Sequence, residues 1–210
     1  ILYHNKNYNS YINFCKLIKK IGKKLKNNIC VFGGSSPGNN DDHKKLAEIV
    51  GKIIAENNFD IIFGGGEHGI MGAVSNSAVK HGSKTTGIIP EFLKKEDILN
   101  IKTPNNFNTK LISTETMHQR KELMYKKSVA FLILPGGIGT LDECCEVLTW
   151  CQLNLIKNKK VGILNFSGYW DLLISLLNNM IIEGFMKPHI LNHFEEIKDI
   201  KSLKKFINDI

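Results

Sequence analysis

Val-Ala-Phe-Leu-Ile-Leu, residues 129–134, runs directly into Pro135-Gly136-Gly137-Ile138-Gly139-Thr140. Six consecutive apolar residues match the length of a strand, and a run without polar alternation is typical of a strand buried on both faces of a sheet. A helical pattern follows, through Asn154. Glycines between a strand and a helix let the backbone approach a ligand and leave the first N–H groups of the helix available to an anion. This stretch therefore predicts a strand, a ligand-binding loop and a helix in succession.

Two earlier stretches have the same design. The apolar run 29–32 is followed by Gly33-Gly34-Ser35-Ser36-Pro37-Gly38, and the run 59–63 is followed by Gly64-Gly65-Gly66. Further strands are predicted at 85–89, 110–112 and 161–164, and helices over 46–54, 69–80, 117–127, 169–183 and 202–210. This alternation predicts an α/β, Rossmann-like doubly wound fold, with a mainly parallel sheet and helices on both faces. Ligands of such sheets bind beyond the carboxyl ends of the strands, where the three glycine loops would meet.

Length and charge bear on the domains and the partners. For a chain of 210 residues we expect one nucleotide-binding domain over 28–210, preceded by a basic N-terminal extension or helix over 1–27. The net charge is +8, but seven Lys and no acidic residue fall within 1–28, so the remainder is nearly neutral. A nucleic-acid partner is therefore not predicted. No apolar run reaches the roughly 18 residues of a membrane span, and no membrane partner is predicted either.

The N-terminal segment and the cysteines bear on the compartment. Residues 11–26 predict an amphipathic helix without the continuous apolar stretch of a secretory signal, while a role in organelle targeting stays open. The sequence has no CxxC spacing, and the pair His189/His193 follows Pro188 outside a clear helix, so no metal site is predicted. We expect a cytoplasmic protein with reduced, buried thiols. The five cysteines are Cys15, Cys30, Cys144, Cys145 and Cys151.

Arg120 is the one arginine among 28 basic residues. A guanidinium is planar and makes forked hydrogen bonds to phosphate or carboxylate, which a lysine cannot do. Thr116 and Gln119 fit a capping box, which places Arg120 in the first turn of a helix. A cation there is unfavourable by a few tenths to about 1 kcal/mol, and an anion would offset this cost. Arg120 is therefore a candidate ligand-binding residue.

The loop that contains Gly136, Gly137 and Gly139 is the best candidate for a phosphate site. Thr140 is predicted at the N-cap of the following helix, where its hydroxyl can also donate to a ligand. The loop is neither a Walker A sequence nor the dinucleotide pattern G-x-G-x-x-G, so its phosphate belongs to a ligand other than ATP or NAD. Thr140 and Glu143 also fit a capping box, which is the purely structural alternative for Glu143.

Three ordered motifs carry a family resemblance, and they are Gly64-Gly65-Gly66-Glu67-His68-Gly69-Ile70-Met71-Gly72, Met117-His118-Gln119-Arg120-Lys121 and Pro135-Gly136-Gly137-Ile138-Gly139-Thr140-Leu141-Asp142-Glu143. Together they resemble the LONELY GUY family of cytokinin-activating phosphoribohydrolases, whose members are often labelled possible lysine decarboxylases. The similarity covers roughly residues 28–190 and includes Gly168-Tyr169-Trp170. Gly33 departs from it, since many members have Cys there, and the Lys-rich segment 91–106 aligns poorly. No pyridoxal phosphate site is evident in the motifs.

The resemblance implies hydrolysis of the N-glycosidic bond of AMP or an N6-prenylated AMP, giving free base and ribose 5-phosphate. It implies a catalytic pair of Arg120 and Glu143, no cofactor, and a homodimer with the active site near the interface. A non-catalytic nucleotide or molybdenum-cofactor carrier on the same fold is the alternative. Substrate-binding residues are expected to be Lys121, Gly136, Gly137, Ile138, Gly139, Thr140, Leu141, Asp142, Thr149, Gly65, Gly66, Ser35, Met117 and Glu96.

The implied chemistry suits these residue types. Breaking a ribosyl C–N bond builds positive charge on the sugar, which a carboxylate such as Glu143 stabilises. Arg120 would clamp a phosphate or a carboxylate, while the glycine loop holds the 5′-phosphate and so positions the sugar. The sequence leaves open how Arg120 and Glu143 share these tasks. The group that protonates the leaving base, either Glu143 or water, and the preferred base are open as well.

Overall fold

A computed structural model describes residues 27–95 and 109–210 of the chain. Its centre is one sheet of seven parallel strands, in the order β4-β3-β2-β1-β5-β6-β7. The order reverses between β1 and β5, which creates the switch point where doubly wound folds bind ligands. The strands are β1 (Asn28–Phe32), β2 (Asp60–Phe63), β3 (Thr85–Pro90), β4 (Thr109–Thr114), β5 (Ala130–Ile133), β6 (Lys160–Leu164) and β7 (Glu195–Ile197).

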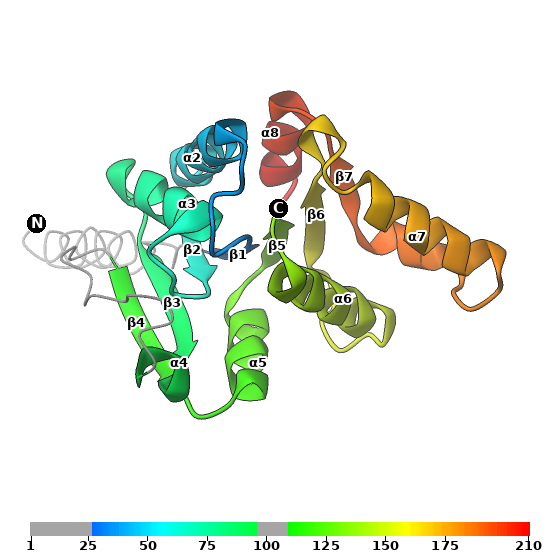
Figure 1. The fold of residues 1–210 in the computed structure, drawn as a ribbon, viewed down its shortest axis with the longest axis horizontal. Helices are drawn as coiled ribbons and strands as arrows, with labels where there is room; N and C mark the ends of the chain where they lie inside the picture. The colour runs from blue at the N-terminus through cyan, green and yellow to red at the C-terminus, as the bar shows by residue number, and fades with distance from the viewer. Residues whose placement is uncertain (1–26, 96–108) are drawn as a thin grey trace, which may run out of the picture.

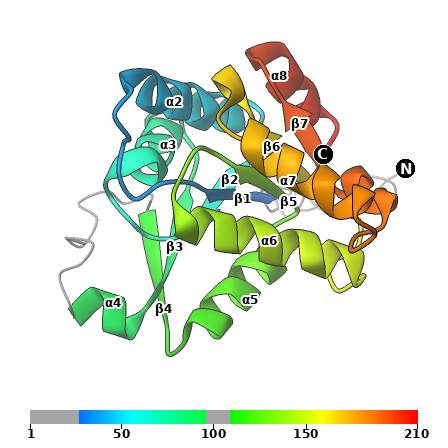
Figure 2. The same cartoon turned by 45° about the vertical axis from the view of Figure 1, so that its right-hand side comes forward.

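Helices cover both faces of the sheet, as Figures 1 and 2 show. Helices α2, α3 and α8 share one apolar core with the sheet, and α5, α6 and α7 share the other. The predicted α/β, Rossmann-like fold is thus confirmed. The helices are α2 (Asp41–Glu56), α3 (Gly69–Lys80), α4 (Glu91–Lys95), α5 (Met117–Lys127), α6 (Ile138–Gln152), α7 (Asp171–Ile182) and α8 (Ile200–Asn208), with 3-10 turns η1 (Phe166–Gly168) and η2 (Pro188–His193).

Strand β1 shows why the apolar runs are continuous. Ile29 and Val31 pack into the core under α2, α3 and α8, whereas Cys30 and Phe32 pack into the core under α5, α6 and α7. All four side chains are fully buried, so neither face of the strand tolerates a polar residue. The neighbouring strand β5 pairs with β1 in register and is equally buried.

Most predicted elements are present, with ends that shift by a few residues. Strand β7 and the short helix α4 were not predicted from the sequence. Strand β7 has only three residues, two of them acidic, because it lies at the sheet edge, where a charged side chain reaches water. Helix α7 starts at Asp171 rather than at 169. The helix predicted over 11–26 lies outside the described residues.

The cysteines follow their prediction in part, and Cys15 lies outside the described residues. Cys30, Cys144 and Cys151 are free and buried, but Cys145 is exposed, because it lies on the outer face of α6. In the described ranges no group of three or more His, Cys, Asp or Glu could hold a metal ion. No helix within those ranges is both long and apolar enough to cross a bilayer.

Candidate active site

The three glycine loops meet at Gly34, after the central strand β1. Its N–H donates to the Pro135 carbonyl at 3.0 Å, and its carbonyl accepts the N–H groups of Ile70 at 3.0 Å and Met71 at 3.3 Å. A Cβ at Gly136 would lie 2.7 Å from the Gly34 nitrogen, closer than real Cβ atoms approach. Only a glycine at position 136 therefore lets the loops after β1 and β5 pack together.

The phosphate loop enters α6 earlier than predicted. The N-cap of α6 is Gly137, not Thr140, which lies buried in the first turn. The N-cap prediction for Thr140 is wrong because the helix start follows from how the loop is held, not from a local cap. Gly137 has no side chain to cap the helix, so the first N–H groups of α6 are available to an anion.

Helix α5 brings Arg120 to the same edge. Thr116 is the N-cap and accepts the Gln119 N–H at 3.1 Å, while the Gln119 side chain accepts the N–H of Glu115 rather than that of Thr116. Arg120 is buried, and its Nε donates to the Ile88 carbonyl at the end of β3 at 3.0 Å. The terminal Nη2 lies against Gly64, where a Cβ would clash with it.

Arg120 and Glu143 form a buried ion pair. Nη1 of Arg120 lies 3.0 Å from Oε1 of Glu143, and the two side chains are 9% and 7% exposed. The capping-box alternative for Glu143 is therefore wrong, because α6 begins at Ile138 and the carboxylate pairs with Arg120 instead. Burial raises the pKa of Glu143 to about 7, although the Arg120 charge opposes that rise. The anion that offsets the Arg120 charge inside the protein is thus Glu143.

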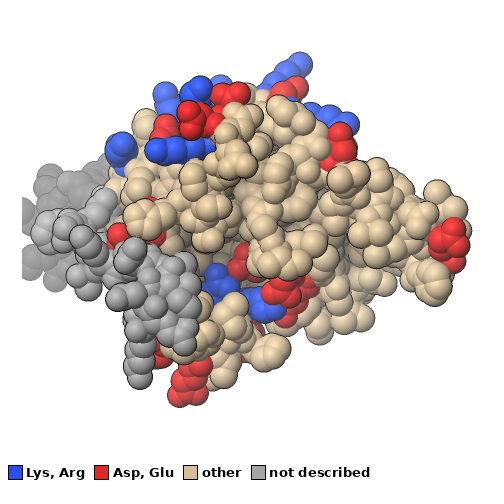
Figure 3. Space-filling model, in the orientation of Figure 1, with Lys and Arg blue, Asp and Glu red and all other residues tan. Residues whose placement is uncertain are grey.

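A second set of charges joins α5 to α6 beside this pair. Nζ of Lys121 lies 3.0 Å from Asp142 and 2.6 Å from Oε2 of Glu146. The buried phenol of Tyr125 donates to the same Glu146 oxygen at 2.8 Å. The Asp142 and Glu146 hydrogen bonds outweigh the desolvation of Lys121 and raise its pKa, so the ammonium stays charged. Figure 3 shows acidic and basic side chains meeting in a recess near the middle of this face.

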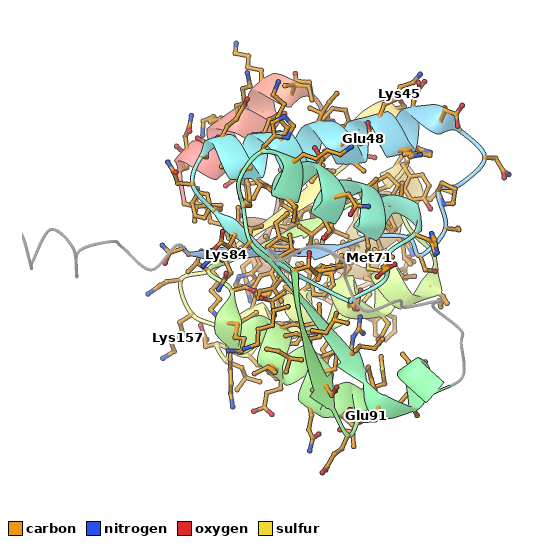
Figure 4. All side chains as sticks on the ribbon, turned by 90° about the vertical axis from the view of Figure 1, so that its left-hand side faces the viewer. Lys45, Glu48, Met71, Lys84, Glu91 and Lys157 are labelled. Atoms are coloured by element: carbon orange, nitrogen blue, oxygen red, sulfur yellow. The ribbon has the colours of Figure 1, made fainter. Side chains whose placement is uncertain are left out.

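A hollow of about 210 Å³ lies between the first and third glycine loops. Gly34, Gly136 and Gly137 line it together with His43 of α2 and Tyr169, which follows η1. Two larger hollows lie elsewhere, one between α2 and α3 and one near the start of β6. In Figure 4, Lys45 and Glu48 of α2, which line the hollow between α2 and α3, lie near the top of the view, while Lys84 and Lys157 lie on the other side of the view from Met71. We place the candidate site at the carboxyl edge of the sheet, where the first and third loops line the smaller hollow and Gly64 of the second loop contacts Arg120 of the buried ion pair.

The other residues that were predicted to bind the substrate differ in their surroundings and in their exposure. Gly65 follows β2 and lies beside β3, Gly66 lies near Met71, and Met117 is half-buried at the start of α5. Ile138 is 82% exposed beside the loop. Thr149 is exposed, its hydroxyl donates to the Cys145 carbonyl, and it lies about 9 Å of helix rise beyond Glu143. Ser35, Gly139 and Asp142 are exposed, Gly136 and Leu141 are half-buried, and Glu96 lies outside the described residues.

Sequence reasoning missed three neighbours of the site. They are His43, Gly64 as the contact of Arg120, and Tyr169, whose hydroxyl donates to the Gly136 carbonyl. Tyr169 belongs to the Gly-Tyr-Trp sequence that contributed to the family resemblance, which was the available signal. The contact itself joins residues 33 positions apart, and local patterns do not reveal such pairs.

Comparison with known proteins identifies the family. A family model described as possible lysine decarboxylase matches residues 71–206. Cytokinin riboside 5′-monophosphate phosphoribohydrolase LOG1 of Arabidopsis thaliana is 38% identical over 181 residues, 86% of this chain and 82% of the relative. LOG3 of the same plant is 40% identical over 160 residues, 76% of this chain and 72% of the relative. The chain belongs to the LONELY GUY family.

Solved structures extend the likeness of this LONELY GUY protein in fold alone. The molybdenum cofactor binding protein from Rippkaea orientalis has a TM-score of 0.63 at 21% identity, with 89% of this chain and 98% of that chain covered. The molybdenum cofactor carrier protein from Chlamydomonas reinhardtii has a TM-score of 0.62 at 18% identity, with 88% and 97% covered. At such identities the shared sheet and helices carry no information about the ligand.

Proposed function

We propose that this protein hydrolyses the N-glycosidic bond of a nucleoside 5′-monophosphate, either AMP or an N6-prenylated AMP, to free base and ribose 5-phosphate. The observation that carries the proposal is the buried Arg120–Glu143 ion pair beside the Gly136–Thr140 loop. Relatives at 38–40% identity are named for this reaction on cytokinin riboside 5′-monophosphates. A phosphate loop next to a buried carboxylate matches a substrate that has a phosphate at one end of its sugar and a scissile bond at the other.

Glu143 is the proposed catalytic carboxyl group. In the reaction the oxygen of water bonds to C1′ of the ribose, the C1′–N bond breaks, and a proton ends on the base. An ionised Glu143 stabilises the positive charge that builds on the sugar, and a protonated Glu143 can supply the proton. Because its pKa is raised to about 7, both forms are populated near neutral pH. This supports a role for Glu143 at the reacting end of the sugar.

Arg120 and the loop position the substrate in this proposal. The Arg120 guanidinium is fixed by the Ile88 carbonyl and by Glu143, so it holds the carboxylate in one orientation. The N–H groups at the start of α6 bind the 5′-phosphate, and the helix dipole favours a negative charge there. Lys121 contributes a positive charge beside the loop and ties Asp142 and Glu146 to α5. The other predicted binding residues keep that role as part of this proposal.

A homodimer in the cytoplasm completes the proposal. Helix α7 has a stripe of exposed apolar side chains at Leu172, Leu176 and Met180, and Figure 3 shows this side of the molecule almost free of charge. Contiguous apolar surface of this kind marks an interface, and a two-fold axis would pair it with itself. The Tyr169 hydroxyl, two residues before α7, donates to the Gly136 carbonyl, so the phosphate loop lies near the start of that surface. Free thiols at Cys30, Cys144 and Cys151 fit a reducing compartment.

The deciding experiment is chromatographic detection of free base after incubation with AMP, isopentenyl-AMP, GMP, IMP and CMP. Glu143→Gln serves as the matched variant, since Gln keeps the shape of the side chain and loses its charge. We expect base from AMP or its prenylated form, and a rate for Glu143→Gln that is lower by about 10²-fold or more. A folded and fully active Glu143→Gln would refute the assignment. Tight nucleotide binding without base release would favour a carrier.

A further inference from the structure

Tyr169 holds the start of the phosphate loop from outside the loop. Its hydroxyl donates to the Gly136 carbonyl at 2.8 Å, and the preceding carbonyl, that of Pro135, accepts the Gly34 N–H at 3.0 Å. Two consecutive carbonyls of the loop are therefore each fixed by a separate part of the chain. Each of these carbonyls belongs to the same peptide group as the N–H of the next residue.

Peptide planarity turns these carbonyl contacts into control of the N–H groups. The Gly136 carbonyl and the Gly137 N–H belong to one planar trans peptide, so they point in opposite directions. When Tyr169 holds the carbonyl, the Gly137 N–H points away from Tyr169. Glycine at both positions would otherwise let this peptide rotate freely, because glycine occupies a wide range of backbone angles.

The turn that precedes Tyr169 is held in one backbone conformation. Ser167 and Gly168 both have positive φ angles, 55° and 72°, and a serine in that region is strained. Asn165 supports the turn: its side-chain oxygen accepts the Trp170 N–H at 2.7 Å, and its amide donates to Asp171 at 2.7 Å and to Glu196 at 2.6 Å. A strained turn with this much support presents the residue after it in a single direction.

The ring of Tyr169 is fixed as well. It meets His43 edge-on at 5.4 Å between ring centroids and Trp170 edge-on at 4.9 Å. The ring thus forms one wall of the 210 Å³ hollow, with Gly136 and Gly137 on another side. Such edge-to-face contacts restrict the ring, so the direction of its hydroxyl is set before a ligand arrives.

We infer that Tyr169 is a positioning residue for the phosphate of the substrate, acting through the Gly136–Gly137 peptide. The inference rests on the proposed function for the identity of the substrate. Tyr169 does not touch the phosphate: its hydroxyl holds the peptide whose N–H group, together with the first N–H groups of α6, faces the anion. Loss of that hydroxyl should therefore weaken binding of the phosphorylated part of the substrate and leave the base alone.

Binding of the two reaction products separates these effects. We would measure the Kd of ribose 5-phosphate and of adenine by calorimetry for the wild type and for Tyr169→Phe, which keeps the ring and removes only the hydroxyl. We expect the Kd of ribose 5-phosphate to rise about tenfold and that of adenine to change less than twofold. With AMP as substrate, KM should rise by a similar factor while kcat stays within about threefold.

Ser83→Ala is the matched control. The Ser83 hydroxyl donates to the Phe59 carbonyl, so this variant also removes one hydroxyl–carbonyl hydrogen bond, just before β3 and thus at the opposite edge of the sheet. It should leave both Kd values unchanged. An unchanged Kd for ribose 5-phosphate in Tyr169→Phe, an equal loss for adenine, or no binding of ribose 5-phosphate by the wild type would each overturn the inference. The expected binding pattern without base release would refute only the proposed function.

Discussion

Gly64→Ala should disable the active site through a single methyl group. A Cβ at Gly64 would lie closer than 3.0 Å to Nη2 of Arg120, and ordinary contact begins at 3.4 Å. The guanidinium would have to move by roughly 1 Å to restore ordinary contact. It has little room, because Nε is bonded to the Ile88 carbonyl and Nη1 is 3.0 Å from Glu143.

The size of the effect follows from what that movement breaks. A hydrogen bond to a charged group contributes about 1.5–3 kcal/mol, so the free energy of unfolding should fall by roughly that amount. The activity should fall more, since a displacement of about 1 Å at a reacting group costs around 100-fold in rate. Gly64→Ala should therefore remain folded at 25 °C and release base from AMP about 100 times more slowly than the wild type.

A double-mutant cycle with Arg120→Lys tests whether the clash with Arg120 causes the loss of activity in Gly64→Ala. Lysine has no atom in the place of Nη2, so an alanine at position 64 no longer clashes with residue 120 in that background and keeps only the closer contact with Met71, at 3.2 Å from its sulfur. The rate of the double variant should then equal that of Arg120→Lys alone, within about a factor of two, when base release and urea unfolding are both measured. Multiplicative losses from the two substitutions would refute the contact between Gly64 and Arg120 as the reason.

Three further predictions concern charge and assembly. Arg120→Lys keeps the charge but loses the fork that reaches both Ile88 and Glu143, so kcat/KM for AMP should fall at least tenfold, and near-normal activity would contradict this role. The Glu143 carboxyl has a pKa of about 7 in the folded protein against an ordinary value of 4.5, so the native state retains a proton that the unfolded chain loses in this range. The free energy of unfolding should therefore decrease as pH rises from about 4.5 to 7, by up to about 3 kcal/mol, and urea titrations of Glu143→Gln should lack this component. Leu172→Glu, on an 86% exposed side chain, should turn a dimer into a folded monomer in sedimentation equilibrium, whereas a monomeric wild type would exclude the proposed dimer.

The central strands could be predicted from sequence because their signal is local and strong. Strand β5 is covered on both faces, and its four residues are all buried, so the chain must be apolar at each position. Strand β7 lacked that signal, since an edge strand of three residues can carry Glu195 and Glu196. The helices that pack on the central strands were also found, but their ends differ by up to five residues, as at the start of α2 at Asp41.

The start of α6 could not be predicted in the same way. Thr140 is a good N-cap residue in isolation, yet the helix begins at Ile138. The Pro135 and Gly136 carbonyls are held by Gly34 and Tyr169, which are distant in sequence, so the loop enters the helix before it reaches Thr140. Tertiary contacts outweigh the local preference here, and no single-window pattern contains them.

The candidate catalytic pair could be predicted from the sequence only in part. Arg120 stood out as the one arginine of the sequence, and the family resemblance added Glu143. Their contact depends on α5 and α6 lying side by side on one face of the sheet, which follows from the strand order and not from either helix. Composition could indicate the residues, but only the fold brings them within 3.0 Å.

The three carboxyl groups on α6 lie in different environments, and we propose a catalytic role for one and structural roles for the other two. Asp142 and Glu146 share the Lys121 ammonium and are 57% and 21% exposed, whereas Glu143 is 7% exposed and faces Arg120. Arg120 is hydrogen-bonded to the Ile88 carbonyl and faces Glu143, but the burial of Glu143 outweighs the Arg120 charge and raises the pKa of the carboxyl group to about 7. A carboxyl group in that state can lose or gain a proton at neutral pH, as the role proposed for Glu143 in cleaving a glycosidic bond requires. Asp142 and Glu146 hold α6 against α5 through Lys121, and that contact keeps Glu143 buried.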